Sequence, residues 1–136
     1  MNRISEEQID RLMLLVQKQA NDLSRLLTAP TWYEVTSFSN SWVNYGTWAG
    51  AAYCKDVFGF VHLRGLIKSG TVGTPGSESE AFTLPFGYRP ATMLLFGTIS
   101  NGAIGRVDIL TDGKVAPLTP SNNTYVALDG ITFYAG

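Results

Sequence analysis

The stretch ATMLLFGTISNGAIGRVDILTDGKVAPL, residues 91–118, decides the fold class of this chain. It contains Asn101-Gly102 and Asp112-Gly113, two dipeptides that supply the positive φ angles of primed hairpin turns. The residues around these dipeptides are apolar, β-branched or aromatic in short runs, which is typical of strands. The stretch therefore predicts three antiparallel strands, over Ala91–Ser100, Ile104–Thr111 and Lys114–Leu118.

The second of these strands has two unlike faces, because side chains alternate along a strand. Val107 and Ile109 share a predicted core face. The opposite face mixes apolar and charged residues, namely Ile104, Arg106, Asp108 and Leu110. A mixed face of this kind suits a contact between subunits better than open water.

A further hairpin is predicted from Ala52–Val57, through a turn at Gly59, into Phe60–Lys68. Its second strand places Val61, Leu63 and Ile67 on the core face, opposite His62, Arg64, Leu66 and Lys68. Several short strands with such turns over about a hundred residues predict an all-β head, an antiparallel β-sandwich or barrel. We assign residues 30–136 to this head.

The first thirty residues have a different composition. All 14 glycines and all 16 aromatic residues of the chain follow Thr31, whereas eight of its 21 charged side chains precede it. Ser5 and Gln8 form a capping-box pattern that predicts the start of a helix, and Pro30 predicts its end. Residues 1–29 are therefore predicted to form a helix outside the β domain.

The apolar residues of this helix follow a heptad pattern. They occupy successive a and d positions at spacings of three and four residues, namely Ile9, Leu12, Val16, Gln19, Leu23 and Leu26, with Gln19 a polar d. The pattern predicts a coiled coil between copies of the chain. Ile and Val at a with Leu at d favour two strands by the simple rule, so the heptads alone predict an oligomer and not a trimer. Leu14, Leu15 and Leu27 lie off the seam and leave open an amphipathic helix packed on its own domain.

Composition excludes several classes of protein. Ten Lys and Arg against eleven Asp and Glu give a net charge of −1, which removes the electrostatic basis for nucleic-acid binding. No apolar run approaches the roughly 20 residues that a membrane-spanning helix needs, and the acidic, amphipathic N-terminus does not resemble a signal peptide. One Cys and one His supply too few ligands for a structural metal, so we expect neither a metal nor another cofactor, and no need for an oxidising compartment.

No residue pattern indicates catalysis. Cys54 and His62 fall on adjacent predicted strands, but a single Cys usually packs as a small apolar residue. Glu78 and Glu80 lie in a polar loop rather than in a context that pairs carboxylates for glycoside hydrolysis. The sequence therefore predicts a protein that is not an enzyme.

The remaining chemical signal is aromatic, since Trp42, Tyr45, Trp48 and Tyr53 fall within twelve residues among Asn and Gly. These side chains either fill the core of a small β domain or present flat apolar surfaces to sugar rings. The residues by themselves do not decide between the two interpretations.

Several of these residues lie in motifs whose order follows a known pattern. The motifs are Trp42–Gly46, Tyr53–Asp56, Gly59–Gly65, Phe82–Pro90 and the turn Asp112-Gly113. Together they resemble the C-terminal head domains of bacteriophage tail-fibre and receptor-binding proteins, especially baseplate proteins of siphophages that infect Gram-positive bacteria. The resemblance covers Trp32 to Gly136.

This resemblance implies a homotrimer whose β heads, carried on a coiled-coil neck, bind a host cell-wall saccharide near the boundary between protomers. It also implies that the N-terminus contacts other tail or baseplate proteins of a virion assembled in the host cytoplasm. The saccharide residues that it implies are Arg106, Asp108, His62 and Arg64, with Trp42 or Trp48 as the stacking partner. Lys114–Leu118 departs from the pattern because it offers no Trp. Two alternatives remain open, a purely structural trimeric virion component (a capsid fibre or a spacer) and, with no acid pair in its favour, a glycan-degrading enzyme.

Overall fold

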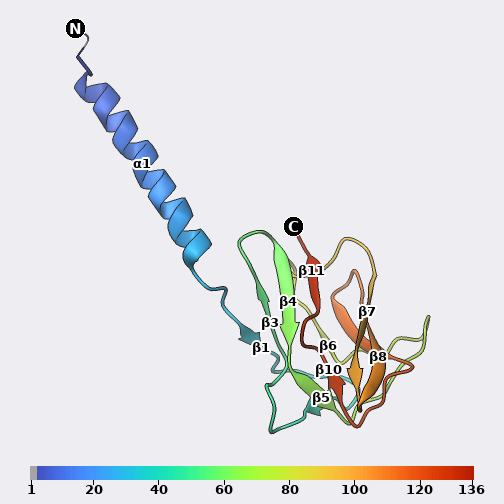
Figure 1. Cartoon of the computed structure of the whole chain (residues 1–136). Coiled ribbons are helices and arrows are strands. Elements are labelled where there is room, and N and C mark those ends of the chain that lie inside the picture. Colours follow the sequence, from blue (N-terminus) through green and yellow to red (C-terminus); the bar gives the residue numbers. More distant parts are fainter. Residues whose placement is uncertain (1–2) are drawn as a thin grey trace. The chain divides into compact units, whose positions relative to one another are not determined.

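The computed structural model describes residues 3–136, which form one helix and eleven strands (Figure 1). The chain divides into two compact units, residues 1–30 and residues 31–136. The first unit is the helix, and the second is an antiparallel β head. The prediction of a helix followed by an all-β head is confirmed at this level.

Helix α1 spans Glu6–Leu27 and begins as its sequence predicts. The Ser5 Oγ accepts a hydrogen bond from the Gln8 backbone N–H at 3.2 Å, and the Ser5 N–H donates to the Gln8 Oε1 at 2.9 Å. None of the helix residues is buried, although Leu12, Val16 and Leu23 are among its large apolar side chains. A helix of this length usually draws most of its stability from burial of an apolar face.

The head contains two sheets. The four-stranded sheet has the order β1-β3-β4-β11, with β1 at Tyr33–Glu34, β3 at Ala52–Lys55, β4 at Phe60–Arg64 and β11 at Thr132–Tyr134. The seven-stranded sheet has the order β2-β5-β10-β7-β8-β9-β6. Its strands are β2 (Val43–Asn44), β5 (Leu66–Lys68), β6 (Phe82–Thr83), β7 (Leu94–Ser100), β8 (Ala103–Ile109), β9 (Lys114–Leu118) and β10 (Val126–Ala127).

One apolar core joins the two sheets. Its buried residues come from both, among them Val61, Leu63 and Phe133 from the four-stranded sheet and Ile67, Val107, Ile109 and Val126 from the seven-stranded sheet. The core faces predicted for the two hairpins, with Val107 and Ile109 on one and Val61, Leu63 and Ile67 on the other, are therefore confirmed.

The strand predicted over Phe60–Lys68 is wrong as a single element. The chain leaves the four-stranded sheet after Arg64 and enters the seven-stranded sheet at Leu66, so β4 and β5 belong to different sheets. Gly65 makes this crossing at a φ of +116°. Alternation continues across the glycine, which is why the predicted core face survives the error.

The predicted turns differ from each other. Asn101 and Gly102 both take positive φ angles, 49° and 75°, as a primed turn between β7 and β8 requires. At the second turn Gly113 has a positive φ of 91°, but Asp112 does not have a positive φ. The connection of β8 to β9 is therefore not the predicted primed turn. Strand β7 also begins at Leu94 rather than Ala91, which follows Pro90 in an irregular segment.

The outer face of β7 and β8 is apolar and exposed. Leu95, Ile99 and Ile104 lie on it, with Ile99 directly opposite Ile104 in the strand register. Arg106 and Asp108 lie on the same face, as predicted, with Asp108 directly opposite Leu95. Asp108 is nevertheless fully buried, and Arg106 binds its carboxylate.

Candidate functional site

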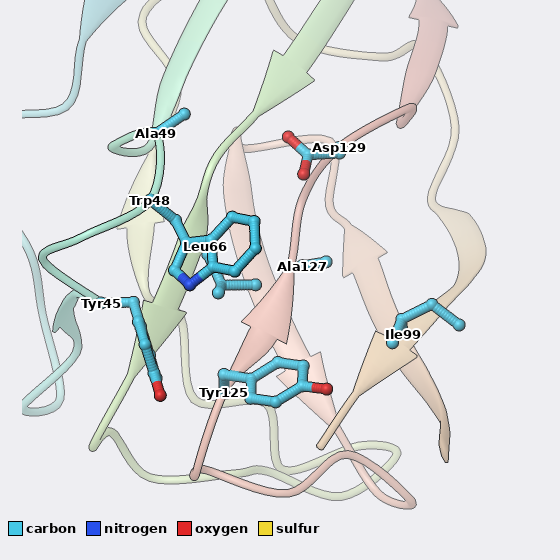
Figure 2. A pocket seen from close by; sticks show the side chains of 8 residues that line it. All are labelled: Tyr45, Trp48, Ala49, Leu66, Ile99, Tyr125, Ala127 and Asp129. Carbon is cyan, nitrogen blue, oxygen red and sulfur yellow. The ribbon is translucent and has the colours of Figure 1, made fainter. Parts of the chain in front are cut away.

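An aromatic pocket opens on the seven-stranded sheet, over the adjacent strands β2, β5, β10 and β7. It has a volume of about 370 Å³, which lies within the range of small-molecule sites. The residues that line it are Tyr45, Trp48, Ala49, Leu66, Ile99, Tyr125, Ala127 and Asp129. Figure 2 shows Tyr45, Trp48 and Tyr125 around this pocket, with Asp129 on another side.

The floor of the pocket is a row of apolar residues on three neighbouring strands. Leu66 on β5 pairs directly with Ala127 on β10, and Val126 pairs with Ser100 on β7, which brings Ala127 beside Ile99. The alternate residues of the same strands, Ile67, Val126 and Ser100, are buried on the core side. Because side chains alternate along a strand, those on one face pack in the core and those on the other face form the floor of the pocket.

The loop that carries Trp48 is fixed to this floor at both ends. The Tyr45 N–H donates to the Leu66 carbonyl at 2.9 Å, and the Leu66 N–H donates to the Ala49 carbonyl at 3.0 Å. The Asn44 Oδ1 accepts a hydrogen bond from the Ala51 N–H at 2.9 Å and closes the loop on itself. Between these anchors the Trp48 side chain is 67% exposed, so its indole ring is available to a ligand.

The walls of the pocket combine aromatic rings with one negative charge, and a lysine outside the pocket contacts one of the rings. The rings of Tyr45 and Tyr125 meet edge to face, with their centroids 6.1 Å apart at 85°. The Lys68 ammonium lies 5.2 Å from the centre of the Tyr45 ring. On another side, the Asp129 Oδ1 accepts a hydrogen bond from the Gly65 N–H at 2.8 Å, which orients the carboxylate at the pocket.

Tyr125 is held in place by a buried serine. The Ser100 Oγ donates to the carbonyls of Asn122 and Tyr125, at 3.0 and 2.9 Å, and accepts from the Asn122 N–H at 2.7 Å. A hydroxyl has one proton, so the two carbonyls share it. Ser100 is only 2% exposed and thus acts as a positioning residue for the loop that ends at Tyr125.

Of the six residues predicted to bind saccharide, only Trp48 lines this pocket. Trp42 is 1% exposed in the core, and its Nε1 donates to the Thr71 carbonyl at 3.1 Å. The prediction that Trp42 is a stacking platform is therefore wrong, because its ring packs against Gly70 and the core and is closed to a ligand.

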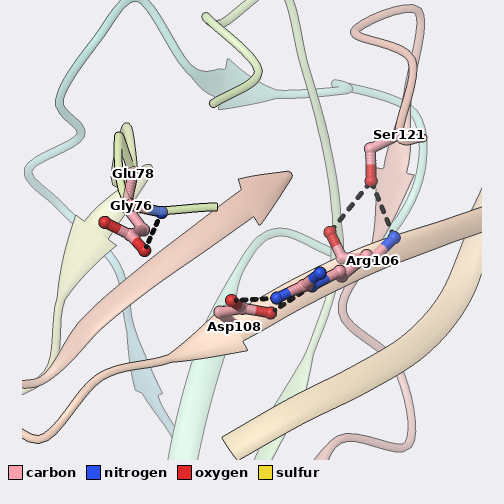
Figure 3. A network of polar contacts seen from close by, with 5 residues as sticks. All are labelled: Gly76, Glu78, Arg106, Asp108 and Ser121. Carbon is pink, nitrogen blue, oxygen red and sulfur yellow. Dashed lines mark hydrogen bonds and ion pairs between the residues drawn. The ribbon is translucent and has the colours of Figure 1, made fainter. Parts of the chain in front are cut away.

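Arg106 and Asp108 form a bidentate ion pair on β8, with distances of 2.8 and 3.0 Å from the Arg106 nitrogens to the two carboxylate oxygens (Figure 3). Asp108 is fully buried and both of its oxygens bind Arg106, so its predicted direct contact with a saccharide is wrong. The Ser121 Oγ bridges the Arg106 N–H and the Arg106 carbonyl, both at 2.9 Å. Arg106 itself lines a smaller depression, of about 280 Å³, with Leu95, Ile104 and Pro120 rather than the aromatic pocket.

His62 and Arg64 lie on β4, in the other sheet. The His62 Nε2 is 2.9 Å from the Asp56 Oδ2, and its Nδ1 is 3.0 Å from the Thr132 Oγ1. The Arg64 guanidinium stacks over the Trp32 ring at 4.3 Å. The structure therefore does not bring these two side chains together with Trp48.

Cys54 and His62 are direct register partners on β3 and β4, as their sequence positions predict. Burial raises the pKa of the Cys54 thiol, which disfavours the thiolate that a nucleophile requires. Within residues 3–136, no group of three or more His, Cys, Asp and Glu side chains is placed to hold a metal ion. In the same residues, no helix is long and apolar enough to cross a membrane.

The bond to His62 should make the stability of the head depend on pH. It holds the pKa of Asp56 below the ordinary value of 3.8, with help from the N–H groups of Phe58 and Phe60. A lowered carboxyl pKa stabilises the fold above the unfolded value and loses this effect as the pH falls through the folded value. We expect the free energy of unfolding, measured in urea at successive pH values, to fall below pH 3.8, and to fall less steeply in Asp56→Asn. Equal slopes for parent and variant would contradict this role for Asp56.

Residues that sequence reasoning missed complete the pocket. Tyr125, Asp129 and Ile99 come from the last third of the chain, far from the aromatic cluster around Trp48. The order of strands β2, β5, β10 and β7 brings these segments together, and that order is not readable from spacing. The only available signal was Asp129-Gly130, a turn dipeptide next to an alternating run.

Comparison with family models finds no match, and comparison with curated proteins finds none either. Among solved structures, the chain is similar to the receptor binding protein (gp15) of Listeria phage PSA. The TM-score is 0.71 and the identity 14%, over 98% of this chain and 82% of that chain. The resemblance stated from the motifs is thus confirmed in three dimensions: this chain has the fold of a phage receptor-binding protein.

Proposed function

We propose that this chain is a non-enzymatic, homotrimeric receptor-binding protein of a phage virion, which holds a saccharide of the host surface in the aromatic pocket. The observation that carries the proposal is an exposed Trp48 beside Tyr45 and Tyr125, at a pocket of about 370 Å³. Flat aromatic rings match the apolar faces of sugar rings, and the Asp129 carboxylate accepts hydrogen bonds from sugar hydroxyls. The shared fold with a phage receptor binding protein supports the same role.

Self-association is the second part of the proposal. The apolar side chains of the predicted seam, Ile9, Leu12, Val16, Leu23 and Leu26, are between 44% and 63% exposed in a single chain. Packing three copies of α1 would bury this seam, and the exposed Leu95 and Ile104, on the outer face of β7 and β8 and outside the pocket, offer the head a further contact between copies. We place the trimer on the tail tip or fibre, with the N-terminus toward other virion proteins.

The oligomer matters for binding because a single shallow site is weak. A dissociation constant of about 1 mM corresponds to only about −4 kcal/mol. Joining several sites on one particle raises the effective affinity by about 10²–10⁴ without any new contact. A trimer therefore turns a weak pocket into a useful attachment device.

Removing the exposed indole tests the site. We expect Trp48→Ala to lower the affinity of the purified chain for host envelope fragments by about tenfold per site, or about 1.4 kcal/mol, as measured by surface plasmon resonance. Phe58→Ala is the matched control, because Phe58 is 69% exposed and lies outside the pocket. Equal binding by Trp48→Ala and the parent would contradict the site. A parent chain that self-associates but binds no envelope would instead support a structural virion component.

A further inference from the structure

We infer that the aromatic pocket selects neutral sugars that carry a methyl group, either a 6-deoxyhexose or an N-acetylated hexosamine. This inference rests on the proposed saccharide site and goes further, because it names the chemical class of sugar. Its basis is the contrast between an apolar floor and a polar rim within the same pocket.

The floor offers no polar partner to a ligand. Leu66, Ala127 and Ile99 have only aliphatic side chains. The Leu66 backbone groups and the Ala127 carbonyl are also occupied, since Leu66 bonds to Tyr45 and Ala49 through its carbonyl and N–H, and the Ala127 carbonyl accepts from the Thr98 hydroxyl. A sugar hydroxyl pressed against this floor would lose its bound water and gain no hydrogen bond, whereas a methyl group would lose nothing and bury apolar surface.

The rim, in contrast, carries the groups that recognise hydroxyls. The Asp129 carboxylate is fixed through Oδ1 by the Gly65 N–H, and its side chain is exposed, so Oδ2 can accept from a ligand. The Trp48 indole N–H and the phenol groups of Tyr45 and Tyr125 add donors at the pocket wall. A sugar stacked on an aromatic ring thus satisfies its hydroxyls at the rim while one edge of the ring points at the floor.

The charges around the pocket favour a neutral ligand. Asp129 lines the pocket and repels a carboxylate or phosphate substituent. Lys68 does not line it, and its ammonium already lies over the Tyr45 ring at 5.2 Å. A sugar acid would therefore meet repulsion at the rim from Asp129, while the Lys68 ammonium lies over the Tyr45 ring.

Matched pairs of sugars test the selection. We expect the full chain to bind L-rhamnose over L-mannose, or L-fucose over L-galactose, or N-acetylglucosamine over N-formylglucosamine, by about tenfold, as one methyl in an apolar pocket provides. The first two pairs test a 6-deoxy group and the third an N-acetyl group, so the arms separate the two sources of the methyl. In saturation-transfer NMR the methyl protons of the bound sugar should receive the strongest signal. Glucuronic acid should bind more weakly than glucose.

Floor variants distinguish this proposal from a general sugar site. We expect Ile99→Thr, which places a hydroxyl on the floor, to reduce the methyl preference to about threefold or less, and to reduce it more than Ile99→Val, whose side chain has nearly the volume of threonine without the hydroxyl. Val57→Thr adds the same hydroxyl to an exposed side chain outside the pocket and should leave the preference unchanged. Equal binding of each methyl-bearing sugar and its matched partner at a Trp48-dependent site would overturn the selection and leave the proposed function standing. Envelope binding that is lost in neither Trp48→Ala nor Ile99→Thr would instead contradict the site itself.

Discussion

The double variant Leu12→Asp with Leu23→Asp is expected to be monomeric and to bind host envelope fragments about 10²–10⁴ times more weakly than the parent chain. Both residues are seam positions, one d and one a, and both are more than half exposed in a single chain, at 53% and 56%. In a coiled coil they would be buried, and a buried unpaired carboxylate is far more costly than a buried leucine. Light scattering after size-exclusion chromatography measures the mass, and surface plasmon resonance on a dense envelope surface measures the binding.

Leu14→Asp is the matched control, because Leu14 is on the same helix, is 71% exposed, and occupies the heptad position opposite the seam. It should keep the mass and the binding of the parent. Binding of an isolated sugar at the pocket should be the same in all three chains, since the head is unchanged. A double variant that keeps the oligomer of the parent, or a parent that is itself monomeric, would contradict the seam and with it the avidity mechanism.

The second large effect is expected at the crossing between the two sheets. We expect Gly65→Ala to lower the free energy of unfolding of the head by about 3 kcal/mol or more, which combines backbone strain with overpacking. An added Cβ would lie 2.6 Å from the backbone N and Cα of Ala51, at a φ of +116° that side chains rarely adopt. For a domain of this size such a loss lowers the melting temperature by roughly 12 °C or more, measurable by calorimetry.

Gly46→Ala separates the two causes. Gly46 has a similar φ of +104°, but an added Cβ there would meet nothing within 4 Å, so only the strain is introduced. Its loss of stability should be about a third of that of Gly65→Ala. Gly65 also bonds to Asp129 and to the Leu128 N–H, both at 2.8 Å, so the stronger variant should disturb the pocket as well as the fold. Equal destabilisation by the two variants would show that the close approach to Ala51 is relieved at little cost.

The elements that could be predicted are those defined by local chemistry. The capping box at Ser5 and Gln8 marks the start of α1, and the alternation around Val107 and Ile109 marks the core face of β8. Both depend on neighbours within a few residues, where the helix and strand periods act directly. The single strand predicted over Phe60–Lys68 was wrong because alternation persists across Gly65 while the strand changes sheets.

The site was harder to predict because its residues meet only through strand order. Trp42 and Trp48 are six residues apart in the same cluster, yet one fills the core beside Gly70 and the other stands exposed at the pocket. Nothing in their local sequence distinguishes them, since both interpretations of an aromatic residue are compatible with Asn and Gly neighbours. Asp108 shows the same limit, because the bidentate bond from Arg106 is what allows its carboxylate to be buried.

The sequence by itself determined the division into a charged helix and an aromatic β head, the helix start, the apolar seam and the alternation of the core faces. Each of these follows from the types and spacing of residues that are close together in the chain. Only the tertiary structure decided which tryptophan is exposed, that Arg106 and Asp108 bind each other, and that Tyr45 and Trp48 share a pocket with Ile99, Tyr125 and Asp129. The reason is that strand order joins segments about 80 residues apart, and a side chain's burial depends on what that order places over it.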